Sequence, residues 1–283
     1  MNINHQEAKI IFCGLPSSGK TSFLGALSYL AENDEVDKDL ELVVLPKERL
    51  FFNELADKWV SCEPMLRTKI SSTDKIEMTL KKCDQRFFIE MPDLSGETWS
   101  ELWTEHQMDN QLISFLNETS CVIFFIHVDE LVVPMSICDE ASIIKGESAD
   151  KDNDHNTKWK PSEHTPTQSI VIDLLRKLST QLADTNKKLA IVLSAWDMLP
   201  DGTAPISFLE KELPLLSQYL NCKFDYDQIE VFGVSAQGGS LNTQENQEIL
   251  LSEDEPSKRI KVTQDGVEYS ADLTKILSWL VNE

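Results

Sequence analysis

The feature that most constrains this chain is a phosphate-binding loop near the start of the sequence. Residues 14–21 read GLPSSGKT and match the pattern G-x-x-x-x-G-K-[ST]. Glycines let the backbone of such a loop curl until successive N–H groups point at phosphate oxygens, and the following helix directs its positive end at the same anion. Lys20 is predicted to reach the β- and γ-phosphates, and the Thr21 hydroxyl to hold Mg²⁺. The residues predicted here to bind a nucleotide are Gly14, Ser17, Ser18, Gly19, Lys20, Thr21 and Ser22.

The segments on either side of the loop fit this pattern. Residues 7–13, EAKIIFC, are typical of a short buried strand, and residues 21–31 carry apolar side chains at helical spacing. Strand, loop and helix are the context that the motif requires. The sequence therefore predicts a protein that binds a nucleoside triphosphate, or one that descends from such a protein.

Strand-like and helix-like segments alternate along the rest of the chain, which predicts an α/β P-loop NTPase domain of three layers. Residues 76–82 and 86–91 form a predicted hairpin, so the sheet should be mostly parallel with one antiparallel edge strand and helices on both faces. We predict one domain over residues 1–283, with polar insertions at about residues 134–165 and 238–269. The other predicted strands are 40–45, 120–128, 189–193 and 230–234. The other predicted helices are 47–60, 169–182, 208–220, with a break at the proline at 214, and 272–281.

The composition excludes two classes of partner. The formal net charge is −22, from 26 basic and 48 acidic residues. Such a field repels nucleic acid and anionic membrane, so neither is an expected direct partner. No run of about 18 apolar residues occurs and the sequence starts with polar residues, so a cytoplasmic location is expected.

A second motif follows the predicted strand at 86–91. Residues 93–96, DLSG, match D-x-x-G, in which the aspartate reaches Mg²⁺ through water and the glycine N–H contacts the γ-phosphate. Asp93 is therefore a candidate metal ligand and Gly96 a candidate nucleotide contact.

Two further motifs favour guanine. Asp197 ends the sequence SAWD after the predicted strand at 189–193, in the place of the guanine-reading N/T-K-x-D. A carboxylate there accepts both the N1–H and the N2 amino group of guanine. Ser235, Ala236 and Gln237 follow the strand at 230–234, in the place of an S-A-K loop whose backbone contacts guanine O6. Each motif comes at the C-terminal end of a strand, where ligands bind in open α/β sheets.

With these motifs the chain resembles the Ras-like, translation-factor-related class of P-loop GTPases. Within that class it is most similar to the bacterial double-GTPase proteins predicted in conflict, or antiphage, gene clusters, in which two such GTPases are paired. The resemblance implies a Mg²⁺-dependent protein that binds GTP and GDP. It departs from the class pattern at Ala195 and Gln237, where both base motifs normally carry lysine. Trp196 either covers the base in place of the first lysine or belongs to the core.

The resemblance also implies a switch and a catalytic group. Thr68, or failing that Thr73, stands where a threonine closes over Mg²⁺ and the γ-phosphate as switch I. Arg67 is a candidate built-in arginine finger, or else a solvated loop residue. Glu97 occupies the place of a water-orienting glutamine. A carboxylate there is a possible base but also repels the γ-phosphate, so slow turnover is expected.

A protein partner is expected because a nucleotide switch acts only through a surface that recognises it. The double-GTPase resemblance suggests a related GTPase as that partner, and antiphage defence as the setting. Trp99 and Trp103 are four residues apart on one helical face. They are either core residues or part of the partner interface.

Two alternative functions remain open on the sequence. Residues 122–130, VIFFIHVDE, match a Walker B strand of an ATPase, with Asp129 on Mg²⁺ and Glu130 as the water-activating base. The eroded base motifs and the absent glutamine at 97 also fit a catalytically inactive, GTP-gated interaction module.

Overall fold

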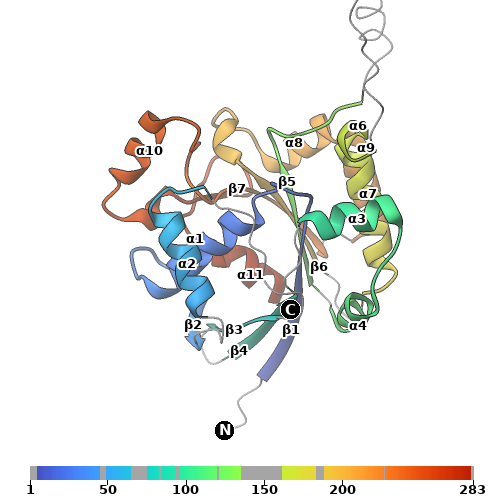
Figure 1. Cartoon of the computed structure of the whole chain (residues 1–283), viewed down its shortest axis with the longest axis horizontal. Coiled ribbons are helices and arrows are strands. Elements are labelled where there is room, and N and C mark those ends of the chain that lie inside the picture. Colours follow the sequence, from blue (N-terminus) through green and yellow to red (C-terminus); the bar gives the residue numbers. More distant parts are fainter. Residues whose placement is uncertain are drawn as a thin grey trace, which may run out of the picture.

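A computed structural model describes residues 5–44, 49–64, 75–82, 85–92, 96–119, 121–134, 161–182, 188–225 and 227–281. An eight-stranded sheet runs through these residues (Figure 1). From one edge to the other its strands are β2 (Glu41–Val44), β3 (Lys75–Lys82), β4 (Gln85–Pro92), β1 (His5–Cys13), β5 (Cys121–His127), β6 (Lys188–Ser194), β7 (Ile229–Ser235) and β8 (Lys261–Thr263).

The sheet is parallel at its centre and antiparallel at its edges. β4, β1, β5, β6 and β7 run parallel to one another. β3 is antiparallel to both β4 and β2, which gives the predicted hairpin at one edge. The predicted fold class is confirmed. An additional strand, β8, lies antiparallel to β7 at the other edge.

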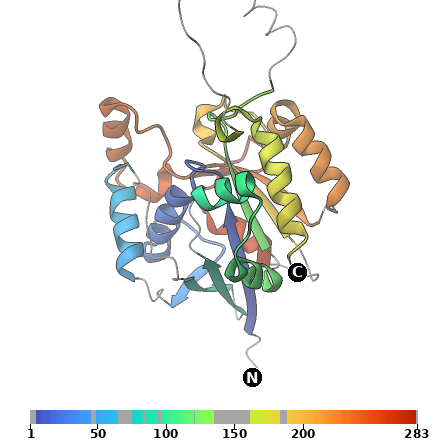
Figure 2. The ribbon, with the colours of Figure 1, turned by 45° about the vertical axis from the view of Figure 1, so that its right-hand side comes forward.

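Helices cover both faces of this sheet. In Figures 1 and 2 the helices α1 and α2 lie on one side, and α7 and α9 lie on the other. One face carries α1 (Lys20–Glu32), α2 (Arg49–Val60) and α11 (Thr274–Val281), and the other carries α3 (Gly96–Glu105), α4 (Asn110–Glu118), α7 (Thr167–Ser179), α8 (Pro205–Glu212) and α9 (Pro214–Lys223).

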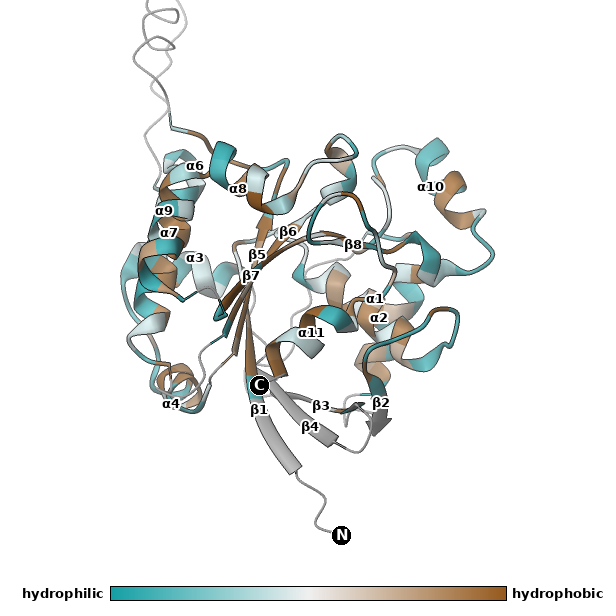
Figure 3. Cartoon of the chain, turned by 180° about the vertical axis from the view of Figure 1, so that it is seen from behind, coloured by the Kyte–Doolittle hydropathy of each residue, from teal (hydrophilic) through white to brown (hydrophobic). Residues whose placement is uncertain are grey.

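The central strands are apolar on both faces because each face is covered. In β1, Ile10 and Phe12 join the cluster under α1 and α11, whereas Ile11 and Cys13 join the cluster under α3 and α7. Successive side chains of a strand point to opposite faces, so a strand buried twice has no polar position. Figure 3 shows the same pattern as brown colouring of β5, β6 and β7.

The two predicted insertions differ in what the structure describes. Residues 135–160 of the first lie outside the described residues, and the short helix α6 (Pro161–His164) follows them. The second contains helix α10 (Gln244–Leu251), the 3₁₀ turn η3 (Pro256–Arg259) and β8. Because β8 pairs with β7, this segment is part of the sheet.

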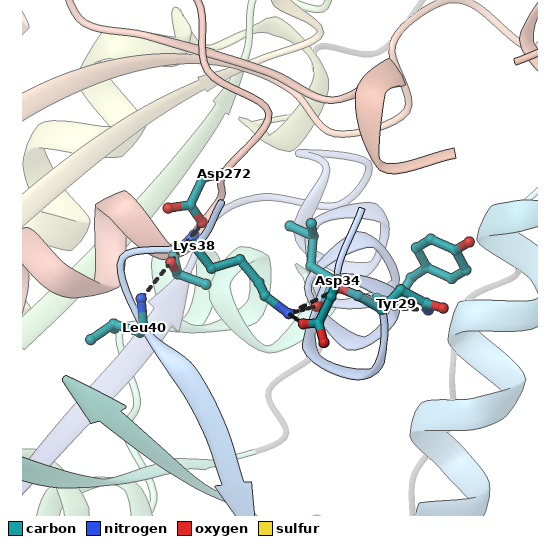
Figure 4. A network of polar contacts seen from close by, with 8 residues as sticks. Tyr29, Asp34, Lys38, Leu40 and Asp272 are labelled. Atoms are coloured by element: carbon teal, nitrogen blue, oxygen red, sulfur yellow. Dashed lines mark hydrogen bonds and ion pairs between the residues drawn. The ribbon is translucent and has the colours of Figure 1, made fainter. Parts of the chain in front are cut away.

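The link between α1 and β2 is fastened to the start of α11 (Figure 4). Asp272 is 1 % exposed. Its carboxylate accepts the backbone N–H of Asp39 at 2.8 Å, and also the N–H and hydroxyl of Thr274 at 2.8 and 2.6 Å. The Thr274 hydroxyl oxygen accepts the N–H of Leu40 at 3.1 Å. Asp272 thus caps α11 and positions the chain that enters β2.

In the part of the chain that the structure describes, no helix combines the length and apolar character that crossing a bilayer requires.

Replacement of Asp272 by alanine should destabilise the fold. Asp272→Ala leaves the buried N–H of Thr274 and the partly buried N–H of Asp39 without their acceptor, which should lower the free energy of unfolding by about 2–3 kcal/mol. Urea denaturation followed by circular dichroism measures this change. Asp34→Ala is the matched control, because the Asp34 side chain is 99 % exposed and its ion pair with Lys38 lies at the surface. Equal unfolding midpoints for the two variants would contradict the assigned role.

Candidate nucleotide-binding site

The phosphate-binding loop lies between the end of β1 and the start of α1, and its glycines are sterically required. Gly19 has φ +89°, and a Cβ there would lie 2.9 Å from the Cβ of Ser194. A Cβ on Gly14 would lie 2.7 Å from the carbonyl oxygen of Phe125. The loop is therefore pressed against the ends of β5 and β6, and any side chain at these two positions would displace it.

Ser194, the last residue of β6, is hydrogen-bonded to the phosphate-binding loop. Its hydroxyl donates to the carbonyl of Ser18 at 2.9 Å and is buried. Ser18 is itself only 3 % exposed. Ser194 begins the SAWD motif, but its support of the loop could not be predicted from the sequence, because a hydrogen bond across 176 positions leaves no local pattern.

Lys20 is folded onto the loop. Its ammonium group donates to the carbonyls of Gly14 and Leu15 at 2.7 and 2.9 Å, and to the Ser18 hydroxyl at 3.0 Å. Phosphate oxygens would compete with these three acceptors for the N–H groups of the Lys20 ammonium. Thr21 and Ser22 follow in the first turn of α1, and both are half-buried.

The charge of Lys20 is sensitive to its surroundings. Burial lowers the pKa of Lys20 to about 8, an effect opposed by the charges of Cys13 and Glu97. Glu97, in the first turn of α3, thus interacts electrostatically with the lysine of the phosphate loop. This places the predicted catalytic carboxylate near the predicted phosphate position.

A cavity of about 310 Å³ opens beside the phosphate loop at the C-terminal ends of the parallel strands. This volume is within the range of small-molecule sites. Four segments line it, namely the phosphate loop with α1, and the chain after β5, after β6 and after β7. The predicted site residues among the lining are Ser17, Gly19, Ser22, Asp197, Ala236 and Gln237.

In the chain after β6, Asp197 is held in a polar cluster. The Ser235 hydroxyl donates to the Asp197 carboxylate and accepts the N–H of Gly238, the latter at 3.1 Å. Ser235 is 1 % exposed, whereas Asp197 is half-buried and lines the cavity. The structure therefore brings the two predicted base motifs together, with one carboxylate at the cavity wall.

Trp196 does not cover the base. It is 3 % exposed, packs edge-on against Phe208 at 5.7 Å and is absent from the described lining of the cavity. A Cβ on Gly233 would lie 2.5 Å from the Trp196 ring, so the indole lies against the bare backbone of β7. Of the two interpretations open on the sequence, the core residue is correct, because the strand leaves a flat space that only an aromatic ring fills.

Trp99 of α3 is also a core residue. Trp99 is fully buried and Trp103 packs, partly buried, against the same hydrophobic cluster. The alternative that they form a partner interface is wrong for Trp99, since a residue with 0 % exposure offers no surface.

Asp129 and Glu130, the acids of the ATPase alternative, also line the cavity. Both are exposed and follow β5, and the Asp129 N–H donates to Nδ1 of His127 at 3.3 Å. Arg67, Thr68, Thr73 and Asp93 lie outside the described residues, and Gly96 is the first residue of α3.

Oxygen donors suited to Mg²⁺ are present in part among the described residues. Thr21 offers a hydroxyl beside the phosphate loop. The described ranges contain no group of three His, Cys, Asp or Glu side chains that would cage a metal. Magnesium commonly binds through one or two protein oxygens together with nucleotide phosphates, so this donor set fits that mode.

Comparison with known proteins decides the family. Residues 11–280 match the Double-GTPase 1 family. The chain belongs to this family. The predicted resemblance to the double-GTPase proteins is confirmed.

Comparisons with individual proteins add little to the family assignment. No curated protein matches the chain. A solved structure titled "Crystal Structure Analysis of sup35 complexed with GDP" is similar, with 12 % identity and a TM-score of 0.36. The match covers 84 % of this chain and 39 % of that chain, so this member of the Double-GTPase 1 family spans well under half of that protein.

Nucleotide affinity should fall as the pH rises above about 8. Phosphate binding requires the Lys20 cation, whose pKa in the free protein is about 8. Phosphate oxygens will raise that pKa, so binding takes up a proton above pH 8 and affinity falls by up to about tenfold per pH unit. Calorimetry of GDP binding at about pH 9, in buffers of different ionisation enthalpy, measures the uptake. At about pH 7 the same experiment is the control and should show none; uptake absent at both values would contradict this interpretation.

Proposed function

We propose that this chain is a Mg²⁺-dependent, guanine-selective switch protein with slow GTPase activity, which acts with a protein partner. One observation carries the proposal. One cavity is lined by the phosphate loop and by Asp197, which is hydrogen-bonded to the buried Ser235, at the strand ends where α/β sheets bind ligands. A nucleotide with its phosphates at the loop would direct its base toward Asp197.

The chain's own groups suit the two ends of such a ligand. Lys20 would exchange its loop carbonyls for the β- and γ-phosphates, and the loop N–H groups and the α1 N-terminus would complete the anion site. The Asp197 carboxylate would accept the N1–H and N2 amino group of guanine. Ser235 would keep that carboxylate oriented, since its hydroxyl already donates to it.

Thr21, Thr68 and Asp93 are the residues that would hold Mg²⁺. When bound, this ion would neutralise charge on the β- and γ-phosphates. Glu97 would orient or deprotonate the attacking water, while its charge interaction with Lys20 limits its repulsion of the γ-phosphate. Gly96 would offer its N–H to the γ-phosphate, and Arg67 would neutralise charge in the transition state.

Guanine selectivity is the first expected outcome. Wild-type protein should bind GTP and GDP more tightly than ATP, and Lys20→Ala should abolish binding of all of them. Asp197→Asn should weaken GTP binding by about tenfold or more, because the amide replaces one of the two carboxylate acceptors with an NH₂ donor that faces a guanine donor. The variant should favour XTP, whose C2 carbonyl accepts from the amide. Fluorescent-nucleotide titration measures these affinities.

The control for that series is Glu130→Gln. The ATPase alternative assigns the water-activating base to Glu130, so this variant should lose turnover only if that alternative holds. Tighter binding of ATP than GTP by the wild type would overturn the guanine assignment. Membership of a GTPase family supports the guanine interpretation.

Hydrolysis is expected to be slow alone and faster with a partner. A related GTPase is the partner we propose, as the family description "Double-GTPase 1" suggests, and the net charge of −22 favours a basic rim on it. Arg67→Ala should lower stimulated phosphate release by about a thousandfold without changing GDP affinity. Glu97→Ala should also lower stimulated phosphate release.

Arg176→Ala is the matched control for the arginine, because Arg176 is an exposed residue of α7 paired with Asp173. Its phosphate release should equal that of the wild type. Phosphate release that no partner stimulates would support the alternative of an inactive, GTP-gated interaction module. A role in antiphage defence rests on the family resemblance, and loss of phage resistance in cells carrying Lys20→Ala would support it.

A further inference from the structure

The loop at the end of β7 is hydrogen-bonded to a tryptophan that lies far away in the sequence. Residues 235–238 form this loop, here called the base loop. Trp59, in the last turn of α2, is fully buried, and its indole N–H donates to the carbonyl of Ala236 at 2.9 Å. The two residues are 177 positions apart in the sequence.

Trp59 is itself held firmly from two sides. The guanidinium of Arg259, which is 6 % exposed, lies 4.5 Å from the centre of the Trp59 ring and donates to the Trp59 carbonyl at 3.3 Å. Gln237 donates its side-chain amide to the same carbonyl at 3.1 Å. Stacking and hydrogen bonds together fix the position of the indole N–H.

This contact fixes how the base loop presents its backbone. A peptide unit is planar and trans, so the N–H of Gln237 points away from the carbonyl of Ala236. That carbonyl is turned toward Trp59, which belongs to the core and is not among the described residues that line the cavity. Ala236 and Gln237 do line it. The Ala236 carbonyl, which is the acceptor of this peptide unit, therefore faces the core.

The consequence for base choice is chemical. Guanine carries an acceptor, O6, where adenine carries a donor, the N6 amino group. With the Ala236 carbonyl held in the core, the peptide unit between Ala236 and Gln237 can offer an N–H to O6 but no carbonyl to an amino group. We propose that Trp59 is a specificity-determining positioning residue, which selects guanine over adenine by holding the Ala236 carbonyl away from the cavity. The proposal rests on the guanine-nucleotide function given above.

The arrangement also accounts for the departure at Gln237. The class pattern has lysine at this position, but here the side-chain amide reaches back to α2. The amide N–H of Gln237 stabilises the base loop through this bond to α2. A lysine ammonium in the same place would lose its hydration.

Trp59→Phe tests the proposal, because it removes the indole N–H and keeps an aromatic ring under Arg259. The carbonyl of Ala236 then lacks its donor, and rotation of the peptide unit would present it to the cavity. The ratio of ADP to GDP dissociation constants should fall by about tenfold. The ratio of IDP to GDP constants should stay unchanged, because hypoxanthine keeps O6 and lacks only the N2 amino group that Asp197 would bind.

Trp279→Phe is the matched control. Trp279 is half-buried in α11 and packs against Phe232, outside the described cavity lining, so its removal should leave both ratios at the wild-type values. Gln237→Met is a second test variant, which removes one of the bonds to the Trp59 carbonyl. It should shift the ADP/GDP ratio in the same direction by a smaller factor, and it decides the question should Trp59→Phe not fold.

The outcomes separate this proposal from the function on which it rests. An unchanged ADP/GDP ratio in folded Trp59→Phe, including an equal loss of both affinities, would overturn the role of Trp59 and leave guanine selectivity standing. A wild-type protein without preference for GDP over ADP would overturn the proposed function itself.

Discussion

The structure depends on the burial of a tightly curled loop against the ends of β5 and β6. Such a loop brings backbone carbonyls into a region with little water, and each needs a donor. Lys20 supplies donors to two of them and Ser194 to a third. The neighbouring strands must approach closely, which is why Gly14 and Gly19 have no room for a Cβ. The close approach of β5 and β6 to the phosphate loop follows from the need to give each of these carbonyls a donor.

The second half of the site is supported differently. The base loop is positioned by side chains from α2 and from the segment after α10, and a buried guanidinium is the centre of this support. Arg259 lies where helix α2 ends, and its donors satisfy carbonyls of Trp59 and Val60. The acidic, polar segment that contains Arg259 thus stabilises the cavity wall through one buried cation.

Prediction from the sequence succeeded where burial is periodic or a motif fixes the backbone. The strands at 189–193 and 230–234 are found as β6 and β7, and the proline at 214 marks the break between α8 and α9. It failed for β8, because a strand of three residues in a polar segment has no periodicity to detect. It left Trp196 and Trp99 undecided, since an aromatic residue at helical spacing can face either the core or solvent.

The sequence by itself determined the phosphate loop, the order along the chain of the five parallel strands, and the positions of Asp197 and Ser235 at strand ends. Those features follow from backbone geometry and from the spacing of apolar residues, both of which are local. Only the tertiary structure decided that Trp196 is buried against Gly233 and that Trp59 and Arg259 hold the base loop. Contacts across 177 or 200 positions depend on how helices pack on the sheet, and no local pattern carries that information.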